Sequence, residues 1–285
     1  CTFTKNQEWE YKIDKSDTLK YPIFWKSKLA TTHTKSKAIV EENNIQFGQY
    51  IGQTINAFLN NEQVDFIASH GHTIFHQPEN NYTLQIGCGK TISNATKITT
   101  INNFRSLDVS LNGQGAPLVP IGDLLLFPEH KYCVNLGGFA NISIKKNEKI
   151  IAFDICPANI VLNDICKELG IEYDSNGDIS RKGKIIPTLL QQLNQLDFYI
   201  KKAPKSLGRE WVEENIFPIL KNNNSQDLLC TFCEHVAIQI GKFLTDESAL
   251  FTGGGVFNSF LMERITFHSK SEILVPNKEL IEFKE

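Results

Sequence analysis

The order of short strands and helices along this chain constrains its fold more than any other sequence feature. Three apolar segments, separated only by tight turns, follow one another at residues 132–136, 140–144 and 150–154. A further strand is predicted at 249–252, and between these strands the apolar residues recur at helical spacing over 159–169, 185–193, 210–220 and 227–244. Strands mixed with helices in this way are typical of an α/β domain.

The first part of the chain has a pattern of the same kind. A long helix is predicted between Ser36 and Asn60, where the apolar residues form one stripe. A short helix is expected around 91–95, and strands are expected at 8–14, 65–69, 82–86 and 97–101. Because the pattern starts afresh beyond Pro117 and Pro120, we predict two domains, residues 1–117 and 118–285.

Composition narrows the class of partner. The 29 Lys and Arg residues against 32 Asp and Glu give a net charge of -3, so there is no basic excess for a nucleic acid or an anionic membrane, and a small-molecule partner is favoured. The seven cysteines are odd in number and mostly lie in apolar runs, which indicates reduced thiols in the cytoplasm. No apolar run approaches the length of a membrane span.

Both ends of the sequence suggest a fragment. The chain begins at Cys1, its single Met is Met262, and its last residues follow an unfinished amphipathic pattern. A lipid-bearing Cys1 of an exported protein is the alternative, and the apolar surroundings of most other cysteines disfavour it.

Two turns rich in glycine and asparagine are candidates for nucleotide contact. Glycine at a strand end lets backbone N–H groups approach phosphate oxygens, and a following helix N-terminus adds a favourable dipole. The candidate residues are Asn135, Gly137, Gly138, Asn141, Gly253, Gly254, Gly255 and Asn258. For Gly137 and Gly138 an ordinary tight hairpin turn is an equally good interpretation, whereas three successive glycines favour a functional one.

Asp154 is the candidate catalytic residue. It is predicted at the end of an apolar strand, just before Pro157, where open α/β sheets place their ligands, so it could act as a general base or anchor a metal-bound water. A helix-capping Asp is the alternative, but Asn159 is better placed to cap the next helix.

A third set of candidates lies where the first domain gives way to the second. Polar residues and glycines of this kind suit a hydroxylated sugar that bears a carboxylate. The candidates are His70, Arg105, Asp108, Gln114, Gly115, Ala116 and Pro117. His70 and His72 lack the partners of a recognised zinc site, so no metal ligand is assigned, and the pair Cys230 and Cys233 fits core packing better than redox chemistry. Lys205 and Arg209 could equally meet phosphate or form surface pairs.

Taken in order, these motifs resemble those of the anhydro-N-acetylmuramic acid kinases. The match runs over most of residues 64–262, and its most specific part is Gln114-Gly-Ala-Pro-Leu-Val-Pro120, since Gly-Gly-Gly-x-x-Asn alone occurs in many folds. The matching segments are Ser69–Ile74, Thr83–Gly87, Asn103–Pro120, Asn135–Ile142, Phe153–Asn159, Pro204–Glu210 and Gly253–Asn258.

The resemblance implies a two-domain actin-like (ribonuclease H-like) sugar-kinase fold with mixed sheets flanked by helices. It implies ATP in the cleft between the domains, Mg on its phosphates, and a homodimer. It also implies a double reaction, in which water opens the 1,6-anhydro bridge and the released O6 takes the γ-phosphoryl group. Asp154 then falls on the catalytic base, 105–120 on the sugar loop, and the two glycine turns on the nucleotide contacts.

Two departures from the family pattern leave other functions open. The Gly-Thr-Ser-x-Asp-Gly phosphate loop and the helix that closes the first domain fall outside the sequence, and Cys156 and Ala158 stand where glycine is common. A non-catalytic nucleotide- or sugar-binding protein and a kinase for another small sugar or acid are the alternative functions.

Overall fold

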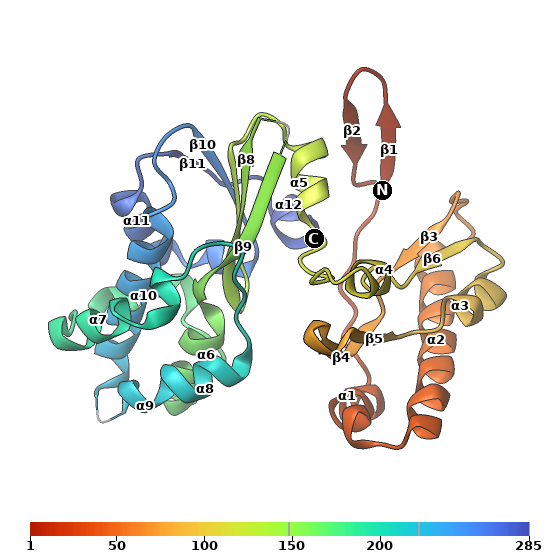
Figure 1. Ribbon diagram of the computed structural model, residues 1–285, viewed down its shortest axis with the longest axis horizontal. Helices are drawn as coiled ribbons and strands as arrows, with labels where there is room; N and C mark the ends of the chain where they lie inside the picture. Colours follow the sequence, from red (N-terminus) through yellow and green to blue (C-terminus); the bar gives the residue numbers. More distant parts are fainter. Residues whose placement is uncertain (148, 222, 285) are drawn as a thin grey trace. The chain divides into compact units, whose positions relative to one another are not determined.

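The computed structural model describes residues 1–147, 149–221 and 223–284 (Figure 1). The chain separates into two compact units. Unit 1 comprises Cys1–Ser16 and Val119–Glu285, and unit 2 comprises Asp17–Leu118. The assignment of the chain to two actin-like lobes stays a prediction. Among the residues that the structure describes, no helix combines the length and the apolar character that a membrane span requires.

Unit 1 is built on one five-stranded mixed sheet. Its strands are β7 (Tyr132–Leu136), β8 (Phe139–Lys146), β9 (Lys149–Pro157), β10 (Ser248–Thr252) and β11 (Glu272–Leu274). The spatial order is β11-β10-β7-β8-β9, with β8 antiparallel to β7 and β9 and with β10 parallel to both β7 and β11. When the five strands are numbered 1 to 5 in chain order and read from β9 to β11, they lie in the order 3-2-1-4-5. Strand 2, which is β8, is antiparallel to its neighbours, and this is the ribonuclease H-like topology. The predicted α/β class and topology are confirmed for this unit.

The helices of unit 1 cover this sheet with apolar faces. The central one is α10 (Ser225–Gly241), along which twelve residues are buried, including Cys230 and Cys233. The predicted packing role of these two cysteines is therefore confirmed. The other helices are α5 (Pro120–Leu126), α6 (Asn159–Glu168), α7 (Pro187–Asn194), α8 (Arg209–Asn215), α9 (Phe217–Leu220), α11 (Ser259–His268) and α12 (Lys278–Phe283).

The predicted helix 210–220 is two helices. α8 ends at Asn215 and α9 restarts at Phe217, with Pro218 in the first turn of α9. Proline has no backbone N–H and its ring clashes with the preceding turn, so a continuous helix is disfavoured there. The chain bends at this point while Val212, Ile216 and Leu220 all stay in the core.

The first residues form a hairpin instead of the single predicted strand. β1 (Thr2–Lys5) pairs antiparallel with β2 (Trp9–Lys12), and both strands are largely exposed. Tyr11 packs its ring on Phe127, with 5.4 Å between the ring centroids. Nearby, the buried carboxylate of Asp123 is paired with the Lys284 ammonium at 2.6 Å, which joins α5 to the end of α12.

Unit 2 has a smaller core and two separate strand pairs. The long predicted helix is α2 (Lys37–Leu59), which packs against α3 (Gly89–Thr96) and contributes Val40 and Phe47 to the core. β3 (Ile67–Ser69) pairs parallel with β6 (Thr100–Asn102), and β4 (His72–Gln77) pairs antiparallel with β5 (Tyr82–Ile86). Two α-helices and one strand of unit 2 were not predicted from the sequence: α1 (Ile23–Thr31), α4 (Ser106–Ser110) and β4.

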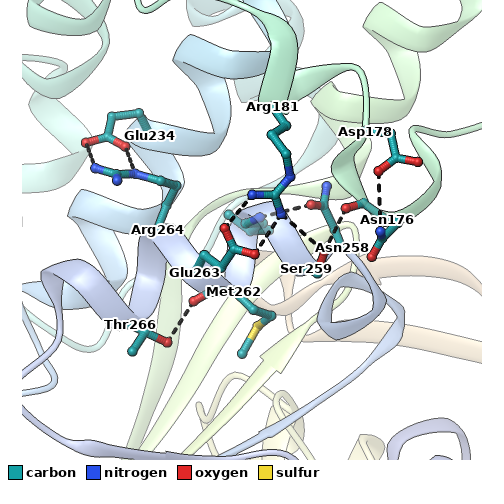
Figure 2. Close-up of polar contacts among 11 residues, drawn as sticks. Asn176, Asp178, Arg181, Glu234, Asn258, Ser259, Met262, Glu263, Arg264 and Thr266 are labelled. Atoms are coloured by element: carbon teal, nitrogen blue, oxygen red, sulfur yellow. Dashed lines mark hydrogen bonds and ion pairs between the residues drawn. The ribbon is translucent and has the colours of Figure 1, made fainter.

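A buried carboxylate ties α10 to α11 in unit 1. Glu234 on α10 accepts hydrogen bonds from Arg264 Nε at 2.6 Å and Nη2 at 3.0 Å (Figure 2). It also pairs with His268 Nε2 at 2.7 Å. Burial by itself raises the pKa of Glu234, but the hydrogen bonds from Arg264 and His268 outweigh it and hold the pKa below its ordinary value. Arg264 and His268 both lie on α11, so these contacts tie the two helices together.

We predict that Glu234→Gln lowers the free energy of unfolding by about 2 kcal/mol, because a charge-assisted pair is replaced by a neutral amide. A carboxylate with a depressed pKa stabilises the fold above its unfolded pKa of about 4.3 and loses that contribution as pH falls through the folded pKa. The difference from wild type should therefore be full at neutral pH and shrink below about pH 4.

Urea unfolding across pH measures this difference. Glu213→Gln is the matched control, because Glu213 pairs with Arg209 on an exposed face of α8 at 2.7 Å. That change should stay within about 0.5 kcal/mol. Equal effects of the two variants at neutral pH would show that the buried pair has no special role.

Candidate functional site

The carboxyl ends of β7 and β10 carry two buried polar atoms that have no partner. The strands are parallel and place Asn135 directly opposite Thr252. Within the described residues, Asn135 Oδ1 and Thr252 Oγ1 are buried without a hydrogen bond. Buried polar groups are normally paired, since an unmade hydrogen bond costs about 1–3 kcal/mol. Two such atoms at one strand edge indicate a position where a ligand or an ordered water completes the bonding.

The three successive glycines follow β10 directly and each has a different surrounding. Gly253 has a φ of +83°, and a Cβ there would collide with Asn135 Oδ1. A Cβ on Gly255 would lie 2.7 Å from Leu136 Cβ. Around Gly254, in contrast, a Cβ would meet nothing within 4 Å. The first and third glycines thus let the turn pack against β7, while the second faces open space.

Beside this turn lies a cavity of about 510 Å³ within unit 1. Gly254, Gly255 and Asn258 line one part of it, and the loop 172–176 lines another. Asn159 and Leu162 of α6 and Lys278 and Glu282 of α12 complete the wall. The sequence analysis assigned no site residue to the loop or to α12, because neither has a recognisable motif. The cavity is large enough for a nucleoside-sized ligand.

Polar contacts hold the loop against the start of α11. Ser259 Oγ donates to the Asn176 carbonyl at 3.0 Å, and Arg181 makes a two-pronged ion pair with Glu263 at 2.6 and 2.7 Å (Figure 2). Gly177 has a φ of +72°, and a side chain there would strike Asn258 Oδ1. Asn258 in turn caps α11 by accepting from Leu261 N–H at 2.9 Å. The cavity wall is therefore anchored to a helix terminus.

The Asn135–Asn141 turn contacts the beginning of α6. The Gly138 carbonyl accepts from Ala158 N–H at 2.8 Å and from Ile160 N–H at 3.1 Å, and the Gly137 carbonyl accepts from Asn159 N–H at 3.2 Å. The prediction that Asn159 caps this helix is wrong, because it lies inside the helix and its side chain donates to the Leu136 carbonyl at 3.3 Å. Backbone carbonyls of the turn satisfy the first N–H groups instead.

Asp154 lies within β9 and not at its end. The strand continues to Pro157, so the predicted position at a strand tip is wrong. A bulge explains the extension: Asn141 is opposite Asp154 and Ala140 is opposite Cys156, which leaves Ile155 as the extra residue. The added residue keeps both Ile155 and Cys156 in the core while the strand bends.

The Asp154 carboxylate is half-buried and has a single protein donor among the described residues. Its Oδ2 accepts from Leu207 N–H at 2.8 Å, and its own N–H donates to the Lys205 carbonyl at 3.0 Å. Burial raises the pKa of Asp154, and the hydrogen bond from Leu207 opposes that change in part. The segment 205–207 was not predicted to contact Asp154, since the two are far apart in the sequence.

The predicted sugar-binding residues of unit 2 are partly brought together. Arg105 Nε donates to His70 Nε2 at 3.0 Å and Arg105 Nη1 donates to the Gly115 carbonyl at 2.6 Å, while Asp108 Oδ2 accepts from Gly115 N–H at 2.6 Å. Burial lowers the pKa of Arg105. Gln114, Ala116 and Pro117 are exposed and take no part in this network.

The two cations on which sequence reasoning was undecided differ in their contacts. Arg209 pairs with Glu213 one turn along α8, which is the surface pairing. Lys205 Nζ donates to the Phe198 carbonyl at 3.1 Å and lies 4.4 Å from the centroid of the Phe198 ring. Within residues 1–147, 149–221 and 223–284, no group of three or more His, Cys, Asp or Glu side chains is placed to ligate a metal.

Comparison with known proteins places the chain in a family. The family model for anhydro-N-acetylmuramic acid kinase matches residues 4–279. An anhydro-N-acetylmuramic acid kinase of Bacillus cereus (strain G9842) is 34% identical over 235 residues, which are 74% of this chain and 62% of that protein. One of Pseudomonas fluorescens (strain Pf0-1) is 35% identical over 248 residues, 80% of this chain and 67% of that protein. The chain thus spans somewhat less than two thirds of the length of the Bacillus cereus relative.

Solved structures are less similar. The activator of the 2-hydroxyisocaproyl-CoA dehydratase from Clostridium difficile, with bound ADPNP, is 13% identical, and the match covers 74% of this chain and 87% of that one with a TM-score of 0.36. A ROK family glucokinase from Streptomyces griseus, in complex with glucose and AMPPNP, is 10% identical over 80% of this chain and 82% of that one, also with a TM-score of 0.36. It is the family match over residues 4–279 and the two kinase relatives that identify the chain, which belongs to the anhydro-N-acetylmuramic acid kinase family.

Proposed function

We propose that this protein is an ATP-dependent kinase that hydrolytically opens 1,6-anhydro-N-acetylmuramic acid and phosphorylates its O6. The observation that carries the proposal is the half-buried Asp154, whose carboxylate has one donor among the described residues and a pKa raised by burial. A raised pKa makes the carboxylate a better proton acceptor than an ordinary Asp. Family membership supplies the substrate, since the two relatives compared above are named as kinases of this sugar.

The proposed reaction uses one base and one phosphoryl donor. Asp154 takes a proton from a water molecule, whose oxygen attacks the anomeric carbon of the sugar. The bond between that carbon and O6 breaks, and O6 leaves with the electron pair. O6 then forms a bond to the γ-phosphorus of ATP, the bond from that phosphorus to the bridging oxygen breaks, and ADP leaves. The proton on Asp154 passes to solvent before the next cycle.

The nucleotide is assigned to the cavity of unit 1. The open space around Gly254 leaves room for an approaching phosphate, and the unpaired Asn135 Oδ1 and Thr252 Oγ1 lie at the strand edge beside it. The hydroxyl of Thr252 is able to donate to a phosphate oxygen, whereas Asn135 Oδ1 is an acceptor and would bind a donor such as a water molecule. Asn141, Gly137 and Gly138 stay candidate contacts. Mg²⁺ is proposed to be carried on the ATP phosphates, where it would neutralise charge.

The sugar is assigned to the loop of unit 2. Arg105 has a guanidinium suited to a carboxylate, and His70 and Gly115 fix two of its N–H groups. Gln114, Ala116 and Pro117 are exposed and free to contact the ring. The cytoplasmic location and the homodimer expected from the family remain part of the proposal, with no nucleic acid or membrane as partner.

We predict that Asp154→Asn lowers sugar-dependent ADP release by at least about 100-fold, because the amide cannot accept the proton. The measurement is a coupled ADP assay on the full-length protein, with circular dichroism to check the fold. Asp164→Asn is the control, since Asp164 is an exposed partner of Lys167 on α6. Normal turnover by Asp154→Asn would remove Asp154 as the base, and binding of ATP and sugar without turnover in wild type would favour a non-catalytic binding protein.

A second prediction concerns the nucleotide. Gly254→Ala adds a methyl group in open space, so the free energy of unfolding should stay equal or rise by up to about 1 kcal/mol. If phosphate approaches this backbone, the same methyl group should raise the Kd for ATP about tenfold, a cost of about 1.4 kcal/mol. Calorimetric titration measures the Kd.

Gly122→Ala is the matched control for this change. Gly122 lies on α5, and a Cβ there also meets nothing within 4 Å. It does not line the cavity. Equal Kd values for the two variants would show that the phosphates do not bind at Gly254.

A further inference from the structure

We propose that the backbone of residues 205–207 is a positioning device for Asp154, in which the Leu207 N–H holds Oδ2 and leaves Oδ1 as the oxygen that takes the proton. The inference deepens the proposed function and rests on Asp154 being the base. It assigns a role to a segment for which the sequence suggested only phosphate contact or surface pairing.

The contact has the geometry of a clamp. Asp154 N–H donates to the Lys205 carbonyl at 3.0 Å, and Leu207 N–H donates to Asp154 Oδ2 at 2.8 Å. One residue of an edge strand is therefore bound through its main chain and its side chain to two alternate residues of the same segment. Within the described residues, Oδ1 of Asp154 has no hydrogen bond from the protein. Because one oxygen is fixed, the carboxylate plane is fixed, and the other oxygen has a defined direction.

The bulge in β9 explains why this residue is available to the segment. Asp154 stands opposite Asn141, and the extra residue Ile155 follows it. A bulge bends the strand and increases its local twist. Beyond the bulge, Ile155 and Cys156 are both in the core, whereas Asp154 remains only half-buried. The strand thus offers the Asp154 side chain at its outer edge.

The segment is tethered on both sides, so its N–H group has a fixed position. On one side, the Lys205 ammonium donates to the Phe198 carbonyl at 3.1 Å and lies over the Phe198 ring. On the other side, α8 starts at Arg209 and places Val212 in the core. A donor held by its own surroundings loses little freedom when it binds the carboxylate, which is the condition for pre-organisation.

The charges around Asp154 make this N–H its main electrostatic partner. Burial raises the pKa of Asp154, and the Leu207 hydrogen bond is the opposing influence, because it stabilises the ionised form. Among the described residues no cation forms an ion pair with Asp154. The Cys156 thiol interacts with Asp154, and the Lys205 and Lys242 ammonium groups interact with that thiol.

Removing the Leu207 N–H tests the inference. Leu207→Pro deletes the donor, and Leu207→Ala keeps it while shortening the side chain. In the full-length protein we expect the acid limb of the profile of kcat/KM against pH to move to higher pH in Leu207→Pro. At pH values below this limb kcat/KM should fall about tenfold, and at pH values above it kcat/KM should return to the wild-type value. In Leu207→Ala the limb should stay at its wild-type position. A purely structural defect would lower the rate by the same factor at every pH.

A second measurement does not depend on turnover. The ¹³C carboxyl resonance of Asp154, assigned by its loss in Asp154→Asn, should titrate at higher pH in Leu207→Pro than in Leu207→Ala. Equal titration midpoints in these two variants would overturn the inference. If the proline variant does not fold, replacing the 206–207 amide by an ester removes the same N–H and keeps the leucine side chain.

The two proposals can fail separately. Turnover by Asp154→Asn would remove the base and leave the resonance shift intact, so the clamp would survive as a structural contact without a catalytic role. A lost resonance shift with an inactive Asp154→Asn would leave the base in place and remove the clamp.

Discussion

The parallel pairing of β7 with β10 is the interaction on which the candidate nucleotide site depends. The register runs from Tyr132 opposite Ala249 to Asn135 opposite Thr252, so the two strands end at the same edge. Both strands are almost entirely buried, and a slip by one residue would turn their side chains to the other face. The turn at Gly253 can pack against Leu136 only in this register. The start of α11 and the cavity wall follow from that contact, since Asn258 and Ser259 come directly after it.

The sequence predicted best those elements whose signal is local. The strands 132–136 and 82–86 coincide with β7 and β5, since each is a short run of strand-forming residues with a turn at its end. The helix between Ser36 and Asn60 coincides with α2, because its apolar stripe is long. In contrast, α1 buries only Trp25 and Leu29, which is too weak a pattern to separate a helix from a loop. β4 was missed because His72, Thr73, His76 and Gln77 break up its apolar residues.

The errors at the candidate sites came from contacts between distant parts of the chain. Asn159 has the right residue type for a helix cap. The N–H groups at the start of α6 are instead hydrogen-bonded to the carbonyls of Gly137 and Gly138. β9 continues beyond Asp154 because β8 pairs with it as far as Phe139, which lies opposite Pro157. A proline at the end of an edge strand is tolerated because no ladder hydrogen bond needs its missing N–H. The Leu207 N–H could not have been predicted, because a backbone group has no residue signature. Residue types thus made Asp154 a candidate, and tertiary contacts decided what surrounds it.

In unit 2 the polar residues of the candidate sugar loop form hydrogen bonds with one another and with His70. Asp108 binds Gly115 N–H, and Arg105 binds both the Gly115 carbonyl and His70. His70 Nε2 accepts from Arg105, and its Nδ1 lies 3.1 Å from the Gly71 carbonyl, so the ring proton belongs on Nδ1. Ordering a polar loop is costly without such bonds. Asp108 therefore shapes the loop, while Arg105 has guanidinium N–H groups beyond the two that bind His70 and Gly115.

Asp123, Asp154, Asp174 and Glu234 are buried or half-buried carboxylates of unit 1, and they differ in how the fold compensates them. Asp174 accepts three hydrogen bonds, from Ile179 N–H and from the N–H and hydroxyl of Ser180. Asp123 is paired with Lys284, and Glu234 with Arg264 and His268. Asp154 has one N–H donor among the described residues, and burial raises its pKa, whereas the hydrogen bonds to Glu234 hold the pKa of Glu234 below its ordinary value. A fold that compensates three buried acids so fully and leaves the fourth with a raised pKa keeps that fourth acid able to take a proton, which is what a general base requires.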